Sequence, residues 1–419
     1  MPLVAQAFDT IADIYRKAER LSVKTIFQHM EPAFAAEGYR TEAADPPQRI
    51  LVLRLDEIGD CVLTIPFLRE LRRAYPDAQI DLAVKPGPYP LMECCPYVNH
   101  VHLADYVPKP GSSMRAFFDW DHAFCAEHLW EQHYDLCLVP RWDIDETYSL
   151  PLAYFCGARQ RIGFSEHCSW AKEEQDAGMN AFLTRPILTP LHVVHEVEKD
   201  LFLLRAGLGI HPVSDKLELW IAKGDAEAVK ARLAAGGITG PYIAVAVGTS
   251  ERRKTYPPEL LAKALMGIRS NLPFVLLGGP GEEAAGAQVA KALKKASRPV
   301  LDLVGQTPLR QSAALVAMAR LYMGGDTGLT HIAAATRRPI VEWWCHPMDV
   351  PTSTLSFVAR FAPWQARALQ IRPAHAAPGC EHLEPGFHEI AGCRSLDEAH
   401  CIAGIQPETI AAAAERMLR

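Results

Sequence analysis

The chain has 419 residues, a formal net charge of -6, 49% hydrophobic residues and 22% charged residues. This length suits two ordinary domains, and the composition is typical of a globular enzyme rather than a disordered chain. The negative net charge provides no general attraction to nucleic acid or to an anionic membrane surface, so any phosphate site has to be built locally.

No apolar run approaches the ~20 residues that a transmembrane helix needs, and the first residues lack the basic and then apolar pattern of a secretory signal. We therefore expect a cytoplasmic protein. Its eleven cysteines are then expected to be reduced thiols, most of them small core residues, rather than a disulfide framework.

Residues 1–45 carry an amphipathic helical pattern and predict an appended helical arm. Its apolar positions include Ile11, Ile14, Ile26 and Met30. Such a face packs against the rest of a protein, or it contacts a membrane surface or a partner.

Short apolar runs then alternate with helical stretches, which predicts parallel strands joined by crossover helices. We expect a Rossmann-like domain over 46–205, a connection over 206–222 and a second Rossmann-like domain over 223–419. The predicted fold class is therefore α/β with two doubly wound domains. Ligands bind beyond the carboxyl ends of such strands, so the expected site is a cleft that both domains face.

The stretch "RLDEIGD" follows the first predicted strand, and Asp60 comes directly after Gly59 at the opening of a helix. Asp is among the best N-cap residues, so Asp60 is either a helix cap or a carboxylate that acts at the cleft. The two roles do not exclude each other.

The stretch "MGGDTGLTHIAAA" places Asp326, Thr327 and Gly328 between a strand and a helix. The free amides and positive dipole end of that helix suit a phosphate group, although a tight glycine turn capped by Asp326 explains the same letters. His331 falls in the first or second helical turn, where a packed, hydrogen-bonded histidine is the commoner role.

The loop "GTSERRKTYPPE" carries hydroxyls and cations after the first strand of the second domain: Thr249, Ser250, Arg252, Arg253 and Lys254. These groups could bind a diphosphate, or they could form a solvated basic loop.

The stretch "LGGPGEEAAG" fits the dinucleotide spacing G-x-G-x-x-A with Gly279, Gly281 and Ala284, and Asp302 follows about twenty residues later. Pro280 inside the turn and the position of the stretch on the second strand of its domain argue against a dinucleotide site.

Near the C-terminus three cysteines occur with three histidines: Cys380, Cys393, Cys401, His382, His388 and His400. None of the spacings is C-x-x-C. We expect unpaired thiols and no bound metal, with a zinc or iron site as the alternative.

Taken together, six segments resemble glycosyltransferase family 9, the heptosyltransferases of lipopolysaccharide synthesis, over roughly residues 49–418. They are "ILVLRLDEIGDCVLTIPFLRELRRAYP", "HEVEKDLFLLRAGLG", "VGTSERRKTYPPELLAKAL", "VLLGGPGEE", "GGDTGLTHIAAATRRPIVEWW" and "CIAGIQPETI". The resemblance implies a GT-B architecture and inverting transfer from ADP-heptose, without a metal or other cofactor. It also implies a lipopolysaccharide or other cell-surface glycan acceptor, met in the cytoplasm or peripherally at the inner membrane surface, and no nucleic acid partner.

The resemblance also assigns roles to residues, with Asp60 at the position of the catalytic base. On the donor side it assigns Thr249, Ser250 and Lys254 to the diphosphate loop, Asp326, Thr327 and Gly328 to a second phosphate turn, His331 to the histidine of that helix, and Glu282 to a ribose contact.

On the acceptor side, Arg54, Asp56 and Gly59 occupy the segment where many of these enzymes have a lysine followed by small hydroxyl residues. Acidic residues in this segment would repel a phosphorylated acceptor.

Two other functions remain open from the residues themselves: a dinucleotide-binding oxidoreductase, and a non-catalytic GT-B-like protein that binds nucleotide.

Overall fold

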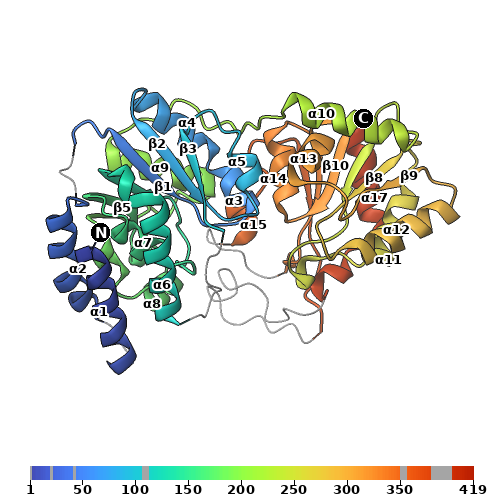
Figure 1. Ribbon diagram of the computed structural model, residues 1–419. Coiled ribbons are helices and arrows are strands. Elements are labelled where there is room, and N and C mark those ends of the chain that lie inside the picture. Colours follow the sequence, from blue (N-terminus) through green and yellow to red (C-terminus); the bar gives the residue numbers. More distant parts are fainter. Residues whose placement is uncertain (1, 19–21, 41–43, 106–112, 350–355, 379–398) are drawn as a thin grey trace. The chain divides into compact units, whose positions relative to one another are not determined.

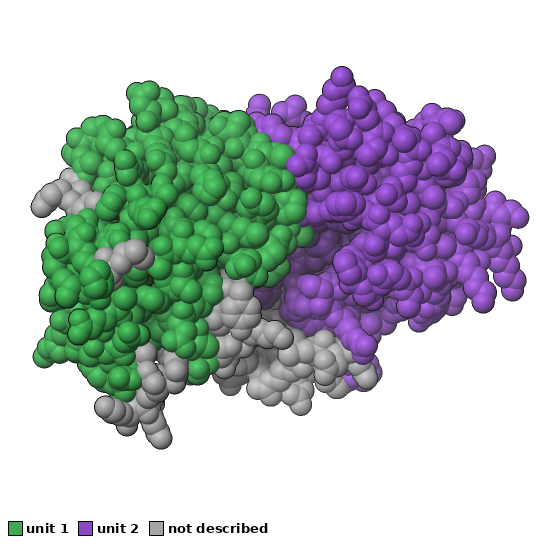
Figure 2. Space-filling view, viewed as in Figure 1, with its two compact units in different colours: residues 1–215 green, residues 216–419 purple. Residues whose placement is uncertain are grey.

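The structure is a computed structural model that describes residues 2–18, 22–40, 44–105, 113–349, 356–378 and 399–419. The chain divides into two compact units, residues 1–215 and 216–419, which Figure 2 shows in different colours. The division lies after Asp215, inside the expected connection over 206–222.

The first unit contains a six-stranded sheet in the order β3-β2-β1-β4-β5-β6, and every pair of neighbours is parallel. This order is that of the classic dinucleotide-binding fold. The apolar run of β1 lies between β2 and β4 at the centre of the sheet, which buries four of its five residues. The strands are β1 (Arg49–Leu53), β2 (Gln79–Val84), β3 (His100–Leu103), β4 (Leu136–Val139), β5 (Gln160–Phe164) and β6 (Arg185–Ile187).

Helices of the first unit flank this sheet (Figure 1). They are α1 (Pro2–Ala18), α2 (Val23–Glu37), α3 (Ile58–Leu63), α4 (Ile65–Ala74), α5 (Tyr89–Met92), α6 (Met114–Phe124), α7 (Ser149–Phe155), α8 (Trp170–Gln175) and α9 (Glu196–Leu208), with the short turns η1 (Cys125–Leu129), η2 (Trp130–Gln132), η3 (Glu166–Cys168) and η4 (Met179–Phe182). Sequence reasoning did not predict α6, because the buried aromatic residues of this segment indicate core positions without indicating a helix.

The predicted arm consists of α1 and α2, and its apolar face lies in the core of the first unit. Phe8, Ile26 and Phe34 are buried in one cluster with Trp130 and Phe155. The ring centroids of Phe8 and Phe155 lie 4.9 Å apart. Packing against the domain, rather than a free amphipathic face, therefore accounts for these residues.

The second unit repeats the same strand order, read as β12-β11-β10-β7-β8-β9, again with parallel neighbours. Its strands are β7 (Ile243–Ala246), β8 (Phe274–Leu277), β9 (Val300–Asp302), β10 (Leu321–Gly325), β11 (Ile340–Trp343) and β12 (Ala368–Ile371). Its helices are α10 (Lys223–Ala235), α11 (Pro258–Gly267), α12 (Glu283–Lys295), α13 (Leu309–Met318), α14 (Gly328–Ala335), α15 (Phe357–Arg360) and α17 (Pro407–Leu418), with the turns η5 (Arg252–Lys254) and η6 (Cys401–Gly404).

Two parallel α/β sheets confirm the predicted fold class. Within the described residues, no helix combines the length and the apolar character that crossing a membrane requires.

Candidate functional site

Asp60 lies beyond the carboxyl end of β1, in the first turn of α3. The prediction that Gly59 and Asp60 open the helix, with Asp60 as its N-cap, is wrong by three residues. The N-cap is Glu57, and Asp60 is the third helical residue. Its Oδ2 accepts a hydrogen bond from the backbone N–H of Glu57 at 3.3 Å, so the carboxylate still satisfies one free amide of the helix start.

The three carboxylates of "RLDEIGD" have different surroundings. Asp56 is buried and forms ion pairs with Arg54 and Arg141. Glu57 is 77% exposed at its side chain and pairs with Lys85 at 2.5 Å. Asp60 keeps 23% of its side chain exposed and, among the described residues, has one cation within ion-pair distance, Arg54 at 3.6 Å. Asp60 is thus the carboxylate of this segment that combines a fixed position with access to a ligand.

The buried side chain of Arg54 contacts both Asp56 and Asp60 of this segment. Its side chain is 2% exposed, and Nη1 donates to the carbonyl oxygen of Pro140 at 2.8 Å and lies 3.1 Å from Asp56. Gly59 is also buried. With their side chains enclosed, Arg54 and Asp56 position Asp60, and a direct acceptor contact by either of them or by Gly59 stays a prediction.

Burial raises the pKa of Asp60, and the positive charge of Arg54 only partly opposes this effect. The negative charges of Glu196 and Glu57 raise the pKa further. A carboxylate whose pKa is raised toward neutrality is a better proton acceptor than an ordinary aspartate.

A second layer from α9 lies behind Asp60, and sequence reasoning did not identify it. Thr64 Oγ1 lies 2.7 Å from Asp200 Oδ2 and 2.9 Å from the backbone oxygen of Asp60. Burial raises the pKa of Asp200 to about 7, with Glu196 among the groups that raise it. The available signal was the pair of acidic residues one turn apart in "HEVEKDLF", Glu196 and Asp200, which are buried in the structure.

In the second unit, the loop after β7 meets the turn after β10, which are neighbouring strands. Lys254 Nζ lies 3.0 Å from Asp326 Oδ2 and 2.8 Å from Glu251 Oε1. Burial works against the charge of Lys254, but Asp326 and Glu251 outweigh it and raise its pKa. The ammonium group is therefore held charged where the two segments join.

The turn after β10 places the start of α14 beside this ammonium group, because Asp326, which Lys254 contacts, directly precedes the N-cap. The N-cap is Thr327, not Asp326 as the capping alternative held, and no side-chain hydrogen bond caps the helix. Burial would raise the pKa of Asp326, yet Lys254 and then His331 lower it overall. His331 is 3% exposed, as expected for a packed histidine. It lies near enough to Asp326 to lower the pKa of that carboxyl group.

The two hydroxyl residues of the loop differ in exposure. Thr249 Oγ1 donates to the backbone oxygen of Glu251 at 2.6 Å and so shapes the loop, whereas Ser250 is exposed. Lys254, Asp326, Thr327 and Gly328 are thus brought together with Thr249 beside them. A Cβ on Gly325 would lie 3.4 Å from Thr249 Cγ2 and 3.3 Å from the Lys254 oxygen, which explains the small residue there.

Glu282 lies across the ends of β7 and β8. Its Oε2 accepts from the backbone N–H of Gly279 at 2.8 Å. A Cβ on Gly248 would lie 2.6 Å from Glu282 Oε1, so this approach needs glycine. A Cβ on Gly278 would also crowd Glu282 Oε2, so Gly248 and Gly278 together admit this carboxylate to the strand ends.

Among the residues that the structure describes, no group of three or more His, Cys, Asp or Glu side chains could hold a metal ion. Cys380, His382, His388 and Cys393 lie outside the described residues. Cys401 is buried, and its Sγ lies 3.5 Å from His400 Nδ1.

Comparison with known proteins identifies the family. The family described as glycosyltransferase family 9 (heptosyltransferase) matches residues 125–374. Lipopolysaccharide heptosyltransferase 3 of Escherichia coli strain K12 is 24% identical over 68% of this chain and 78% of its own. Lipopolysaccharide heptosyltransferase 2 of Salmonella typhimurium is 23% identical over 84% of this chain and 98% of its own.

A solved structure, the E. coli ADP-heptose lps heptosyltransferase II, has the same fold with a TM-score of 0.62 and 20% identity over 88% of this chain and 98% of its own. The family match covers more than half of the chain and includes the loop after β7 and the turn after β10, but it begins after "RLDEIGD". The chain belongs to glycosyltransferase family 9 and is a glycosyltransferase that uses a nucleotide sugar.

Proposed function

We propose that this enzyme moves a heptose from ADP-heptose onto a lipopolysaccharide or related cell-surface glycan, with inversion at the anomeric carbon and without a metal ion. The names of the relatives support the sugar and the acceptor class. The observation that carries the donor side is the Lys254–Asp326 contact of 3.0 Å, which fixes a cation at the start of α14.

Inversion in one step needs a base that takes the proton of the acceptor hydroxyl while its oxygen attacks the anomeric carbon. Asp60 is our candidate, because its carboxylate is partly exposed, fixed by Arg54 and Glu57, and raised in pKa by burial. The acceptor oxygen forms the new glycosidic bond as the bond to the donor diphosphate breaks.

The departing diphosphate gains negative charge as that bond breaks, and catalysis requires groups that stabilise this charge. The Lys254 ammonium, the hydroxyl of Ser250 and the amides at Thr327 and Gly328 are our candidates. Thr249 shapes the loop that carries them. Glu282 is the candidate ribose contact, since its carboxylate lies at the ends of β7 and β8.

The test is a donor screen. Purified protein is incubated with each of several ADP-, UDP- and GDP-sugars and with heptose-deficient lipopolysaccharide, and mass spectrometry detects the nucleotide diphosphate and the extended acceptor. We expect ADP release with ADP-heptose, dependent on the acceptor and unchanged by EDTA. Loss of activity with EDTA would contradict the metal-independent mechanism. Nucleotide binding without turnover for any donor would favour the non-catalytic alternative.

A further inference from the structure

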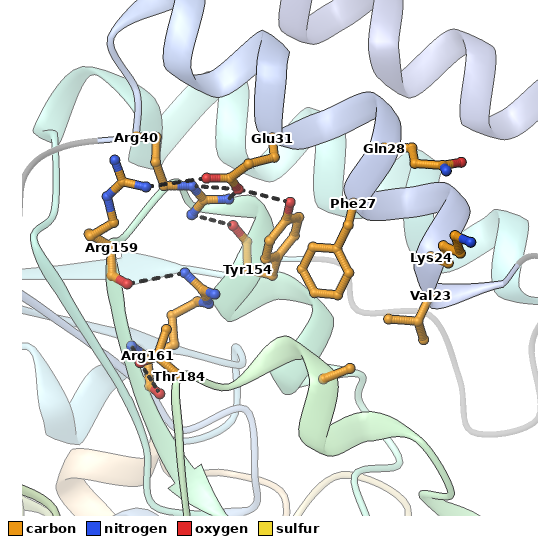
Figure 3. Close-up of a pocket in the computed structure, with 11 residues that line it drawn as sticks. Val23, Lys24, Phe27, Gln28, Glu31, Arg40, Tyr154, Arg159, Arg161 and Thr184 are labelled. Carbon is orange, nitrogen blue, oxygen red and sulfur yellow. Dashed lines mark hydrogen bonds and ion pairs between the residues drawn. The ribbon is translucent and has the colours of Figure 1, made fainter.

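A cavity of about 780 Å³ lies in the first unit, between α2 and the start of β5 (Figure 3). Arg159 and Arg161 flank the first residue of β5, and Thr184 directly precedes β6. The cavity is thus at the amino ends of these parallel strands, whereas Asp60 lies beyond the carboxyl end of β1. Because opposite ends of a strand lie on opposite edges of the sheet, this cavity is separate from the site of Asp60.

The cavity is strongly basic. Among the residues that the structure describes, its lining carries four cations, Lys24, Arg40, Arg159 and Arg161, and the single carboxylate of Glu31, which leaves a local charge of +3. The chain as a whole has a net charge of -6. A concentration of positive charge against that background attracts an anion to this place in particular.

Two of the cations are buried. Arg40 is 5% exposed and Arg161 is 7% exposed, and the guanidinium carbons lie 4.6 Å and 5.0 Å from the ring centre of Tyr154. Burial, and then the charge of Arg40, lowers the pKa of Arg161 to about 10. The charged form of Arg161 is therefore destabilised, and a bound anion would relieve that cost.

Arg161 keeps hydrogen-bonding capacity for such an anion. Its Nε donates to the oxygen of Phe182 and its Nη1 to that of Ala158, each at 2.7 Å. Its Nη2 has no hydrogen-bond partner among the described residues. A phosphate oxygen is a strong acceptor for guanidinium N–H groups.

Glu31 shows how the cavity holds an anion. Its carboxylate accepts from Arg40 Nε and from the hydroxyl of Tyr154, each at 3.1 Å, and lies 3.3 Å from Arg159 Nη1. Figure 3 shows these groups converging on one carboxylate, with Lys24 on the α2 side of the cavity. One carboxylate neutralises one charge, so the described lining of the cavity keeps a net positive charge.

Part of the α2 side of the cavity is apolar. Phe27 is half-buried and packs edge-on against Tyr154 with ring centres 4.6 Å apart, and Val23 lies one turn earlier. A site that pairs cations with an apolar wall suits an anion that carries an organic body. The cavity volume lies in the range of small-molecule sites, which is roughly 300–1,000 Å³.

We propose that this cavity is a second, non-catalytic binding site for a phosphate ester. The phosphate lies on Arg159 and Arg161, and the organic body covers Phe27 and Val23 with Lys24 beside it. Both a free sugar phosphate and the headgroup of a membrane phospholipid have this chemistry. The proposal goes beyond the transfer reaction and does not depend on the role of Asp60 or Lys254.

Calorimetry with glucose 1-phosphate tests the site, with ADP present in excess so that the donor site is filled. The test variant is Lys24→Gln with Arg159→Gln, which leaves the buried Arg40 and Arg161 in place. The matched control is Lys223→Gln with Arg269→Gln, which removes the same charges at positions 91% and 80% exposed in the second unit. We expect the test variant to bind about tenfold more weakly or worse, and the control to bind like the parent.

Phe27→Ala tests the apolar wall, with the melting temperature as a check on folding. It should weaken glucose 1-phosphate binding while leaving inorganic phosphate binding unchanged. Sedimentation with phosphatidylglycerol vesicles, compared with phosphatidylcholine vesicles, separates the two sources. Binding to the anionic vesicles that is lost in the Lys24/Arg159 variant identifies a lipid headgroup, and binding of the free ester alone identifies a soluble ligand.

Three outcomes would overturn the proposal. They are equal affinity in the test variant and the parent, an equal loss in the control variant, and the absence of binding to both glucose 1-phosphate and anionic vesicles. If glucose 1-phosphate bound no more tightly than inorganic phosphate, the proposed contact between the organic body and the apolar wall would be wrong.

Discussion

At the scale of single residues, the candidate site depends on how each charge is partnered. Asp56 and Glu57 stand within four residues of Asp60, yet Arg54 and Arg141 hold the first and Lys85 the second. Asp60 alone of the three is both fixed and partly open. Local charge pairing therefore selects one carboxylate from a cluster.

Asp60→Asn separates the catalytic role from the structural one. Asn keeps the shape and can still accept from the N–H of Glu57, but it cannot take up the acceptor proton. We expect kcat to fall by about 10²- to 10⁴-fold, with the melting temperature and ADP affinity close to those of the parent. The activity of the parent should also fall at acid pH, as the raised pKa of Asp60 is crossed. A variant that transfers sugar at the parental rate would show that the base lies elsewhere.

Lys254→Ala tests the donor loop. Because the ammonium is held against Asp326, its removal should weaken ADP binding by about 1.5 to 3 kcal/mol, or roughly 10- to 150-fold. Thr327→Ala should cost less, since the backbone amides of α14 remain. Lys263→Ala, on the exposed side of α11, is the control. Unchanged ADP affinity in calorimetry of Lys254→Ala would rule out a phosphate role.

At the scale of elements, buried polar and glycine contacts set how helices pack on the sheets. Thr64, the C-cap of α3, contacts Asp200 of α9 at 2.7 Å. The hydroxyl of Thr64 has one proton, and the backbone oxygen of Asp60 is an acceptor. A protonated Asp200 lets both contacts be hydrogen bonds, in agreement with its pKa of about 7.

This contact predicts a pH dependence of stability. The folded-state pKa of Asp200 is about 7 and its ordinary value is 3.8, so folding takes up a proton between these values. The stabilisation is complete below about pH 4 and is lost as pH rises through 7. Asp200→Asn removes this dependence. As pH rises from 5 to 8, the parent should lose roughly 2 to 3 kcal/mol of its free energy of unfolding relative to the variant. Urea unfolding at both pH values measures it, and an equal pH dependence would exclude a protonated Asp200.

Close packing between α12 and the sheet of the second unit depends on Gly286. A Cβ there would lie 2.6 Å from Val304 Cγ2, and that branched side chain is buried. Gly286→Ala should destabilise the second unit by about 1 to 3 kcal/mol. Gly224→Ala, in α10 with no atom within 4 Å of the new Cβ, should be neutral or stabilising by up to about 1 kcal/mol. Thermal unfolding of the pair checks this, and equal effects would argue against the contact.

At the scale of the whole molecule, the chain contains two units with separate hydrophobic cores. The arm formed by α1 and α2 contributes to the first core through residues such as Phe8 and Phe34. The cavity lined by α2 exists because this arm packs there. The N-terminal helices therefore add both stability and a basic cavity to the first unit.

Phe34→Ala tests the independence of the units. Removing a fully buried phenyl ring should destabilise the first unit by about 3 to 5 kcal/mol. Calorimetric melting should then show an early transition that ADP does not move and a later one that ADP raises, because a ligand stabilises only the unit that binds it. A single transition that shifts as a whole in the variant would contradict independent units.

Periodicity and turn residues in the sequence were sufficient to predict the class of fold and most strands, because these features act over a few residues along the chain. They also placed Asp60, Lys254 and the turn at Asp326 beyond strand ends. They did not predict α6, since its buried aromatic residues indicate core positions without indicating a helix. They also did not predict the N-cap positions of Glu57 and Thr327, which lie three residues and one residue from the expected caps Asp60 and Asp326.

Tertiary structure alone decided which charges meet. Lys254 and Asp326 are 72 residues apart, Thr64 and Asp200 136, and Arg159 and Glu31 128. The free energy of such a contact depends on distance and burial, and neither can be read from neighbours along the chain. The sequence by itself therefore determined the two α/β units and the residue types at their strand ends. Only folding decided which carboxylate stays open, which lysine is held beside the helix start, and that four cations gather around one cavity.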